Sequence, residues 1–124
     1  MTGIGIDIIE LGRMAGTIAR SGEVFLRRVF SDDEIQKAHC SDNPTNYFAS
    51  AFAAKEAVFK ALALGWDREV DFREIEVGRG RHGEPLAHLR GDIKRRAEAK
   101  GCGRVLLSLS YETDLAVAMA FAEG

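Results

Sequence analysis

Three charged residues in two separated segments have the types and the spacing that metal-assisted phosphate chemistry requires. Asp7 interrupts an apolar run near the start of the chain, and Glu56 and Lys60 lie four positions apart in an alanine-rich stretch. Because four positions make about one turn of helix, this carboxylate and this ammonium would share one face. Magnesium prefers oxygen ligands and is usually held by carboxylates together with substrate phosphate oxygens, and lysine is a compact cationic phosphate donor. The three residues therefore predict a site for Mg²⁺ and a pyrophosphate.

Each of these residues also has a purely structural explanation. Asp7 could be a carboxylate at a strand end, and a Glu and a Lys at this spacing are often a solvated pair that contributes about a few tenths of a kcal/mol. Gly3 and Gly5 could simply allow close packing of a strand, since a lone G-x-G pattern is too weak to indicate a phosphate loop. The presence of both segments in one chain favours the site.

The element that carries Asp7 is expected to be a strand. Ile4, Ile6 and Ile8 alternate with other residues, which is the period of a strand with one face committed to the core. If the isoleucines form the core face, Asp7 points to the opposite face.

The element that carries Glu56 and Lys60 is expected to be the longest helix, which follows Pro44 and runs over residues 45–64. Its large apolar residues follow a three-four spacing along one stripe, whereas alanines flank the two charged residues on another. These small residues would let another body approach the helix closely. That body could be a ligand, a second subunit or another part of the same chain.

The remaining segments complete an α+β domain. Helices are expected over residues 11–19, 31–39 and 91–100, and strands over residues 75–77, 86–89, 105–110 and 115–122. The second helix would begin with a capping box formed by Ser31 and Glu34. The strands would form two hairpins, one through residues 78–85 and one through residues 111–114. No linker or repeat interrupts the chain, so a single domain over residues 1–124 is expected, with a mainly antiparallel sheet packed against the long central helix.

The composition excludes several classes of protein. Charged residues make up 29% and hydrophobic residues 46% of the 124, and the net charge of -2 gives no general attraction to nucleic acid or to an anionic membrane. The apolar runs are much shorter than the roughly 20 residues that cross a bilayer, and the signal-peptide pattern is missing, so a cytoplasmic protein is expected. Cys40 and Cys102 lie far apart without metal-ligand spacing, which favours free thiols.

The two charged segments resemble the signature motifs of the holo-acyl-carrier-protein synthase family of phosphopantetheinyl transferases. That family opens with G-[IV]-G-[IV]-D, which matches residues 3–7, and its central helix reads (F/W)-A-A-K-E-A-x-x-K-A, which matches residues 52–61. A Gly-x-Pro hairpin at residues 83–85 and a closing S-[IL]-S-x strand at residues 108–111 extend the resemblance over nearly the whole chain. The resemblance implies the 4'-phosphopantetheinyl transferase fold.

The resemblance also implies an activity. 4'-Phosphopantetheine would pass from coenzyme A to a serine of an apo acyl-carrier protein, releasing adenosine 3',5'-bisphosphate. Asp7 and Glu56 would hold Mg²⁺, and Lys60, the third catalytic residue, would neutralise or protonate the departing phosphate. The serine proton would go to Glu56 or to a water that a carboxylate activates. The carrier could belong to fatty-acid synthesis or to a polyketide or peptide synthase, because selectivity lies in surface complementarity.

Further residues would bind the substrates. The residues that the resemblance places at coenzyme A are Lys55, Lys60, Gly65, His82, Gly83, Pro85 and Tyr111. Lys55 could otherwise lie along apolar surface as an ordinary lysine. The residues expected to dock an acidic carrier protein are Arg13, Met14, Arg20, Phe25, Arg27 and Arg28. An ordinary solvated basic face is the alternative for these arginines. Members of the family are commonly homotrimers with the active site between subunits, so a homotrimer is expected.

Two positions depart from the family pattern. Tyr111 stands where the closing strand usually has a histidine, and a tyrosine does not shuttle protons near neutrality as a histidine does. Phe59 stands where a small residue is frequent, and it would reshape the phosphate pocket. The alternative to an active transferase is therefore a catalytically weakened module that binds coenzyme A or a carrier protein. A nucleotide phosphohydrolase is a third hypothesis, to which the arginines lend no support.

Overall fold

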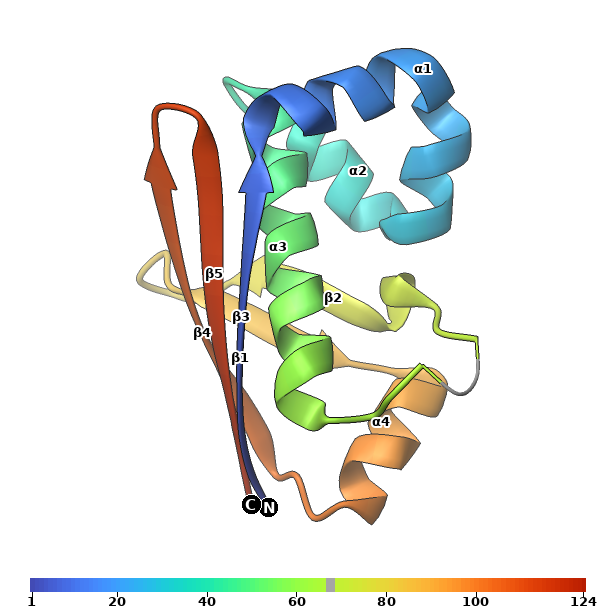
Figure 1. Ribbon diagram of the computed structural model, residues 1–124, viewed down its shortest axis with the longest axis vertical. Helices are drawn as coiled ribbons and strands as arrows, with labels where there is room; N and C mark the ends of the chain where they lie inside the picture. Colours follow the sequence, from blue (N-terminus) through green and yellow to red (C-terminus); the bar gives the residue numbers. More distant parts are fainter. Residues whose placement is uncertain (67–68) are drawn as a thin grey trace.

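The chain folds into an antiparallel sheet with a long helix packed across one of its faces (Figure 1). The computed structural model describes residues 1–66 and 69–124. Within these ranges the elements are β1 (Thr2–Glu10), α1 (Leu11–Val29), α2 (Asp32–His39), α3 (Pro44–Leu62), the 3-10 helix η1 (Phe72–Glu74), β2 (Ile75–Arg79), β3 (Pro85–Leu89), α4 (Gly91–Ala99), β4 (Arg104–Glu112) and β5 (Leu115–Glu123). The predicted α+β class, the antiparallel sheet and the long central helix are confirmed.

The order of the strands places Asp7 and the predicted coenzyme A hairpin at opposite edges of the sheet. The sheet runs β1-β5-β4-β3-β2, and each neighbouring pair is antiparallel. Asp7 of β1 lies opposite Ala118 of β5, and Ala118 lies opposite Leu109 of β4. Strands β1 and β2 are therefore opposite edges of the sheet. The hairpin that joins β2 to β3 is separated from Asp7 by β5 and β4.

The position of β1 was predicted correctly, but the prediction of its buried face was wrong. Ile4, Ile6 and Ile8 are 66%, 56% and 56% exposed. Asp7 lies on the other face, where it contacts α3. The reason is that α3 packs directly on β1 and β5 and leaves no room for large side chains between helix and sheet.

Only small residues fit between the sheet and α3. A Cβ atom on Gly5 would lie 2.1 Å from the Ala57 carbonyl oxygen, which is a severe clash with the helix backbone. The alanines of β5 that line this face and are fully buried are Ala116, Ala118, Ala120 and Ala122. Ala49 and Ala53 of α3 are fully buried as well. These helix alanines therefore serve packing within the chain, which was one of their three expected uses.

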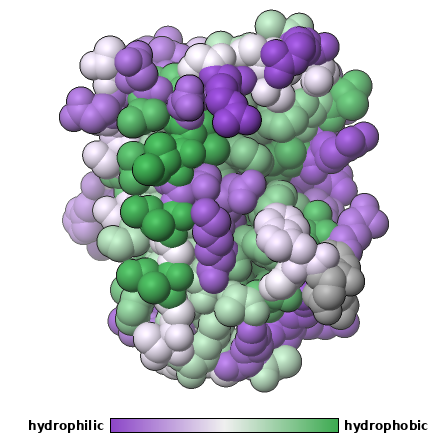
Figure 2. Space-filling model, viewed as in Figure 1, coloured by the Kyte–Doolittle hydropathy of each residue, from purple (hydrophilic) through white to green (hydrophobic). Residues whose placement is uncertain are grey.

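The opposite face of the sheet is apolar and open within this chain. Its exposed large hydrophobic residues are Ile4, Ile6, Ile8, Leu106, Met119 and Phe121. They are neighbours across the strands, since Ile4 pairs with Phe121 and Phe121 with Leu106. Figure 2 shows hydrophobic side chains gathered in a column over β1 and β5, beside a hydrophilic patch over α3. A contiguous exposed apolar face of this kind is typical of an interaction site.

The first two helices follow the prediction except at one bend. α1 continues past its expected end at position 19 to Val29, because Gly22 joins two helical stretches with a backbone conformation (φ 49°, ψ -129°) that suits glycine. α2 starts with the predicted capping box. The Ser31 hydroxyl accepts from the Glu34 backbone N–H, and the Glu34 carboxylate accepts from the Ser31 backbone N–H.

Two further expectations concern thiols and membranes. Both cysteines are free as predicted, with Cys40 exposed and Cys102 buried. Among the described residues, no helix combines the length and the apolar character needed to cross a membrane.

Candidate active site between β1 and α3

Asp7 and Lys60 are joined by a direct contact between β1 and α3. The Lys60 ammonium donates to Asp7 Oδ1 (3.1 Å) and to the Ile6 carbonyl oxygen (3.0 Å). The contact is possible because α3 crosses β1 at Gly5, where a Cβ atom would lie 2.9 Å from the Lys60 Cβ. The lysine side chain is half exposed, whereas the carboxylate is mostly buried. Lys60 therefore holds Asp7 while half of its side chain remains exposed to solvent.

Glu56 faces the same place from one turn earlier on α3. Burial raises the pKa of Glu56 above the ordinary carboxyl value, the negative charge of Asp7 raises it further, and the positive charge of Lys60 opposes these effects. Glu56 precedes Lys60 by one turn of α3 and Lys60 contacts Asp7, so the two carboxylates lie on the same side of the helix. The structure thus brings together the three residues that the sequence predicted to form one site.

One oxygen of this site has no hydrogen-bond partner among residues 1–66 and 69–124. Asp7 Oδ2 is buried and accepts no hydrogen bond from these residues, although Oδ1 is held by Lys60. A buried carboxylate oxygen without a partner costs free energy, and a cation bound beside it would remove that cost. Within residues 1–66 and 69–124, no group of three or more His, Cys, Asp or Glu side chains gathers around one point. Two carboxylates fit a magnesium ion completed by substrate phosphates, not a closed protein cage.

The predicted contact between Lys55 and coenzyme A is contradicted, because this side chain points into the core. Lys55 is fully buried, and its ammonium donates to Glu34 Oε1 (2.9 Å) and to the carbonyl oxygens of Phe72 (2.8 Å) and Ile75 (2.6 Å). An ammonium has three donors, so all of them are used. Burial lowers the pKa of Lys55, and the charge of Glu34 partly offsets this shift. Lys55 ties α3 to α2 and β2 and so supports its neighbour Glu56.

Replacing Lys55 by methionine is expected to lower the free energy of unfolding by about 3–5 kcal/mol, because the buried Glu34 carboxylate loses its counter-ion. Urea unfolding of the wild type and the variant measures this loss. Lys37→Met is the matched control, since it breaks an exposed pair with Asp33 (3.0 Å), for which a loss below about 1 kcal/mol is expected. Equal losses in the two variants would contradict a buried structural pair.

The predicted coenzyme A residues of the β2–β3 hairpin lie far from Asp7 in the same chain. His82 and Gly83 are exposed in the turn, where Gly83 has a φ of 81°, and Pro85 begins β3. The hairpin stands at the β2 edge of the sheet, whereas Asp7 stands at the β1 edge. One chain therefore does not combine these residues with the carboxylates. A hairpin from a second copy would be needed to complete such a site.

The two other predicted coenzyme A residues lie at opposite ends of α3. Gly65 follows the C-terminal end of the helix, which is the end nearer to Lys60, and it has a left-handed backbone conformation (φ 73°). Tyr111 is 47% exposed and its hydroxyl donates to the carbonyl oxygen of Asn46 in the first turn of α3 (3.4 Å). Within one chain, only Gly65 of this pair is close along the helix to the catalytic residues.

Three of the predicted carrier-docking residues share one surface. Arg13, Met14 and Phe25 line a cavity of about 540 Å³ at the end of β1, which we call the carrier cavity. Met14 is 4% exposed and so belongs to the inner wall of this cavity. Phe25 packs edge-on against Phe52, which also lines the carrier cavity and precedes Glu56 by one helical turn. The carrier cavity therefore adjoins the carboxylates.

The other predicted docking residues lie elsewhere on α1. Arg27 and Arg28 line a separate hollow together with Asp71 and Arg73, because the chain bends at Gly22 between the two halves of the helix. Arg20 contacts the Thr17 hydroxyl on the first half (3.5 Å). The predicted arginine cluster is thus divided between two surfaces.

Sequence reasoning missed Trp66 and assigned Phe59 to the wrong place. Phe59 is 3% exposed and packs among aromatic rings, so it does not line the phosphate site as expected. Trp66 lies on Phe59 with 4.3 Å between ring centroids and is 67% exposed. The available signal was that the only tryptophan of the chain directly follows Gly65.

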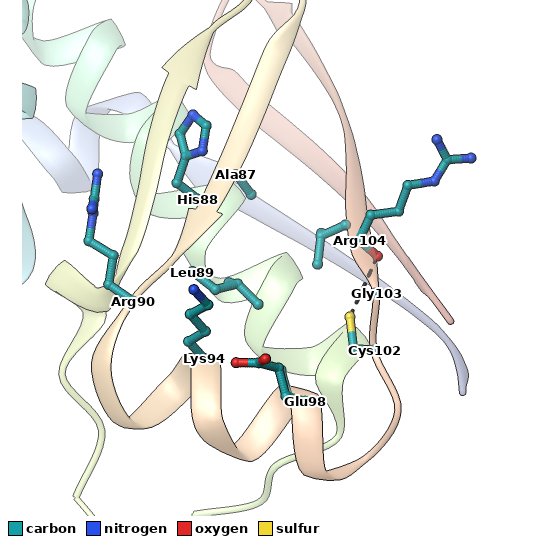
Figure 3. A pocket seen from close by; sticks show the side chains of 11 residues that line it. Ala87, His88, Leu89, Arg90, Lys94, Glu98, Cys102, Gly103 and Arg104 are labelled. Carbon is teal, nitrogen blue, oxygen red and sulfur yellow. Dashed lines mark hydrogen bonds between the residues drawn. The ribbon is translucent and has the colours of Figure 1, made fainter.

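A second cavity lies between β3, α4 and the start of β4 (Figure 3). It measures about 500 Å³, and its wall includes His88, Lys94 and Glu98 beside the buried Cys102. The Cys102 thiol donates to the Arg104 carbonyl oxygen (3.5 Å). No residue predicted to bind coenzyme A or a carrier lines this cavity, so it is separate from the site of Asp7.

Comparisons with known proteins identify the family and confirm the fold. The sequence profile of the 4'-phosphopantetheinyl transferase superfamily matches residues 3–120. A holo-[acyl-carrier-protein] synthase of Vibrio campbellii is 38% identical over 121 residues, which are 98% of this chain and 96% of that protein. The crystal structure of holo-[acyl-carrier-protein] synthase from Neisseria meningitidis has a TM-score of 0.91 and 35% identity and covers 98% of both chains. The Helicobacter pylori synthase, solved in complex with coenzyme A, has a TM-score of 0.83 and 30% identity over 97% of this chain and 99% of that chain.

Proposed function

The chain belongs to the 4'-phosphopantetheinyl transferase superfamily as an enzyme of the holo-[acyl-carrier-protein] synthase kind, and we propose that it transfers 4'-phosphopantetheine from coenzyme A to a serine of an apo acyl-carrier protein. The observation that carries the proposal is the meeting of Asp7, Glu56 and Lys60, which come from separate segments of the chain. The complex of the Helicobacter pylori relative with coenzyme A supports the donor.

Asp7 and Glu56 are the residues that would hold Mg²⁺. Asp7 Oδ2 accepts no hydrogen bond from the described residues, and burial followed by the charge of Asp7 raises the pKa of Glu56, so a bound cation would compensate the negative charge that Lys60 offsets only in part. Bound magnesium would supply Lewis-acid neutralisation of the pyrophosphate charge. The transfer is therefore expected to require a divalent cation.

Lys60 is the residue placed to receive the departing phosphate. Its ammonium is half exposed, and it already contacts the carboxylate that faces the substrate. A lysine donor stabilises the negative charge that develops on the leaving oxygen of adenosine 3',5'-bisphosphate. The serine proton passes to Glu56, or to a water held by a carboxylate, before the new bond to phosphorus is complete.

The carrier protein is expected to dock over the carrier cavity. Its lining includes two residues of opposite charge, Arg13 and Glu10, and the apolar surface of Phe25 and Phe52 next to Glu56. Arg13 would contact an acidic helix that presents a serine, and the apolar surface would hold that helix. Arg27 and Arg28 would act only if the carrier extends past the bend of α1.

The enzyme is expected to be a homotrimer whose active site combines two copies. The open apolar face of the sheet supports association, and the distance between Asp7 and the β2–β3 hairpin supports a site shared between subunits.

A charge at the centre of this face tests the association. Met119→Glu places a carboxylate opposite Ile6 on the open face and is expected to give monomers in size-exclusion chromatography with light scattering, with loss of activity. Val24→Glu, at a more exposed apolar position on α1, is the control that should keep the wild-type mass. If Met119→Glu retains the wild-type oligomer, this face is not the interface.

The proposed reaction is tested by weighing an apo acyl-carrier protein after incubation with the enzyme, coenzyme A and magnesium. A carrier that gains one phosphopantetheine group, together with release of adenosine 3',5'-bisphosphate and a block by EDTA, is the expected result. If the carrier stays unmodified although coenzyme A binds measurably, the proposal is wrong, and a module that binds coenzyme A without transfer is favoured. A range of carriers from different pathways identifies the acceptor.

A further inference from the structure

Trp66 presents an exposed aromatic surface just after the C-terminal end of α3. It is 67% exposed, although its ring packs against Phe59 (4.3 Å between centroids) and Phe72 (6.2 Å). Ala63 and Gly65 have left-handed backbone conformations (φ 52° and 73°), which turn the chain back onto the helix. An indole that is anchored on one side and open on the other is suited to contact a second flat group.

This indole lies beyond Lys60, at the end of the site away from the carrier cavity. Phe59 follows Glu56 by three positions, so these two side chains lie on neighbouring sides of α3 one turn apart, and Trp66 covers Phe59 at the end of the helix that follows Lys60. Phe52, one turn before Glu56, borders the carrier cavity. Along the helix the order is therefore carrier cavity, Glu56, Lys60 and then Trp66.

The geometry of phosphoryl transfer indicates on which side of the site the leaving group lies. The attacking and leaving oxygens lie roughly in line on opposite sides of the phosphorus. A serine that attacks from the carrier cavity would displace the adenosine bisphosphate toward Lys60 and what lies beyond it. The adenine ring then falls at the Trp66 end of α3.

The geometry points to Trp66 as the stacking surface for the adenine base of coenzyme A, an assignment that rests on the proposed function. A purine has a flat π-face, and stacking on an aromatic side chain contributes affinity without requiring hydrogen bonds. The neighbouring ammonium of Lys60 would bind phosphate while the indole binds the base. The two contacts together would orient the leaving group before the serine attacks.

Intrinsic fluorescence tests this assignment directly, because Trp66 is the only tryptophan in the chain. Three probes separate the parts of the substrate: coenzyme A, adenosine 3',5'-bisphosphate and 4'-phosphopantetheine. Saturable quenching by the first two and none by the third is the expected result. Absence of quenching by coenzyme A, in a sample shown by mass to convert a carrier, would overturn the assignment and leave the proposed transferase intact. Equal quenching by 4'-phosphopantetheine would overturn it too.

Kinetics of two variants provide an independent readout. Trp66→Ala is expected to raise the KM for coenzyme A about tenfold while kcat changes less than about twofold, because stacking binds the leaving group without touching the reacting phosphorus. Trp66→Phe keeps an aromatic face and should retain most of the affinity. Val24→Ala removes an equally exposed apolar side chain on α1 and should leave the KM unchanged. An unchanged KM in Trp66→Ala, or an altered oligomer size in its place, would show that Trp66 meets something other than adenine.

Discussion

Glu56→Gln is expected to lower kcat for carrier modification by at least about 100- to 1000-fold, because it removes one of the two carboxylates aimed at the transferred group. The side chain keeps its size, so the packing of α3 on β1 is preserved. Asp7→Asn removes the other carboxylate and should have an effect of similar size. The rate at which the carrier gains mass, measured at saturating coenzyme A, gives kcat for each variant.

The stability of Glu56→Gln shows whether its lower kcat is caused by misfolding. Burial and the charge of Asp7 raise the pKa of Glu56 in the folded protein, so the folded state binds that proton more tightly than the unfolded chain does. The stabilising contribution of Glu56 is therefore largest at low pH and is lost as the pH rises from the ordinary carboxyl value through the raised one. At neutral pH, Glu56→Gln should be at least as stable as the wild type. Glu112→Gln, an exposed carboxylate at the end of β4, is the control for both measurements. Full activity of Glu56→Gln would contradict the assigned site.

Gly5→Ala is expected to destabilise the fold by at least about 4 kcal/mol, an unusually large loss for one added methyl group. The added Cβ would lie 2.1 Å from the carbonyl oxygen of Ala57, 2.8 Å from the backbone nitrogen of Ala61 and 2.9 Å from the Cβ of Lys60. Two of these atoms belong to the helix backbone, which cannot move aside without separating α3 from the sheet. Asp7 and Lys60 would then lose their contact.

Gly12→Ala is the matched control for this substitution. Gly12 lies in α1, and a Cβ atom there meets nothing within 4 Å. Because alanine has the higher helix propensity, this variant should gain about 0.5–1 kcal/mol. Urea unfolding of both variants measures the two changes. A soluble Gly5→Ala protein with a wild-type unfolding midpoint would mean that α3 does not pack against β1 as described.

The meeting of Asp7, Glu56 and Lys60 could be predicted from the sequence because their spacing is local. Glu56 and Lys60 lie one turn apart on any helix, and Asp7 stands out in an apolar strand whatever the strand packs against. Which face of that strand is buried is not a local property. α3 packs so closely on β1 that only the strand face that carries Gly5 can be buried, and Ile6 on the other face stays exposed. The alternation of residues along the strand does not indicate how closely a helix will pack on it.

The errors at single side chains have a similar cause. Lys55 lies next to Glu56 in the motif, but one position on a helix rotates a side chain by about 100°, and this rotation turns Lys55 into the core toward Glu34. The Glu34 carboxylate was predicted only as part of a helix cap. The capping box was correct, yet it accounted for a single bond of a carboxylate that also accepts from Lys55 and from the Val77 backbone N–H (2.8 Å).

The placement of the β2–β3 hairpin could not be predicted from local pattern either. The turn residues around Gly83 identify a hairpin, but the order of strands decides its distance from Asp7. The bend at Gly22, which divides the arginines of α1, depends in the same way on how the second half of the helix packs. Residue types and local spacing could therefore be interpreted from the sequence, whereas the surfaces that these residues form could be found only from the fold.

The proposed transfer requires a divalent cation held jointly by β1 and α3. The decisive measurement is the number of Mn²⁺ ions bound per chain in the presence of coenzyme A, counted from the loss of the free-ion signal in electron paramagnetic resonance. We expect about one ion per chain for the wild type and at least about a tenfold weaker affinity for both Asp7→Asn and Glu56→Gln. Unchanged Mn²⁺ binding in these two variants would contradict the proposed metal site.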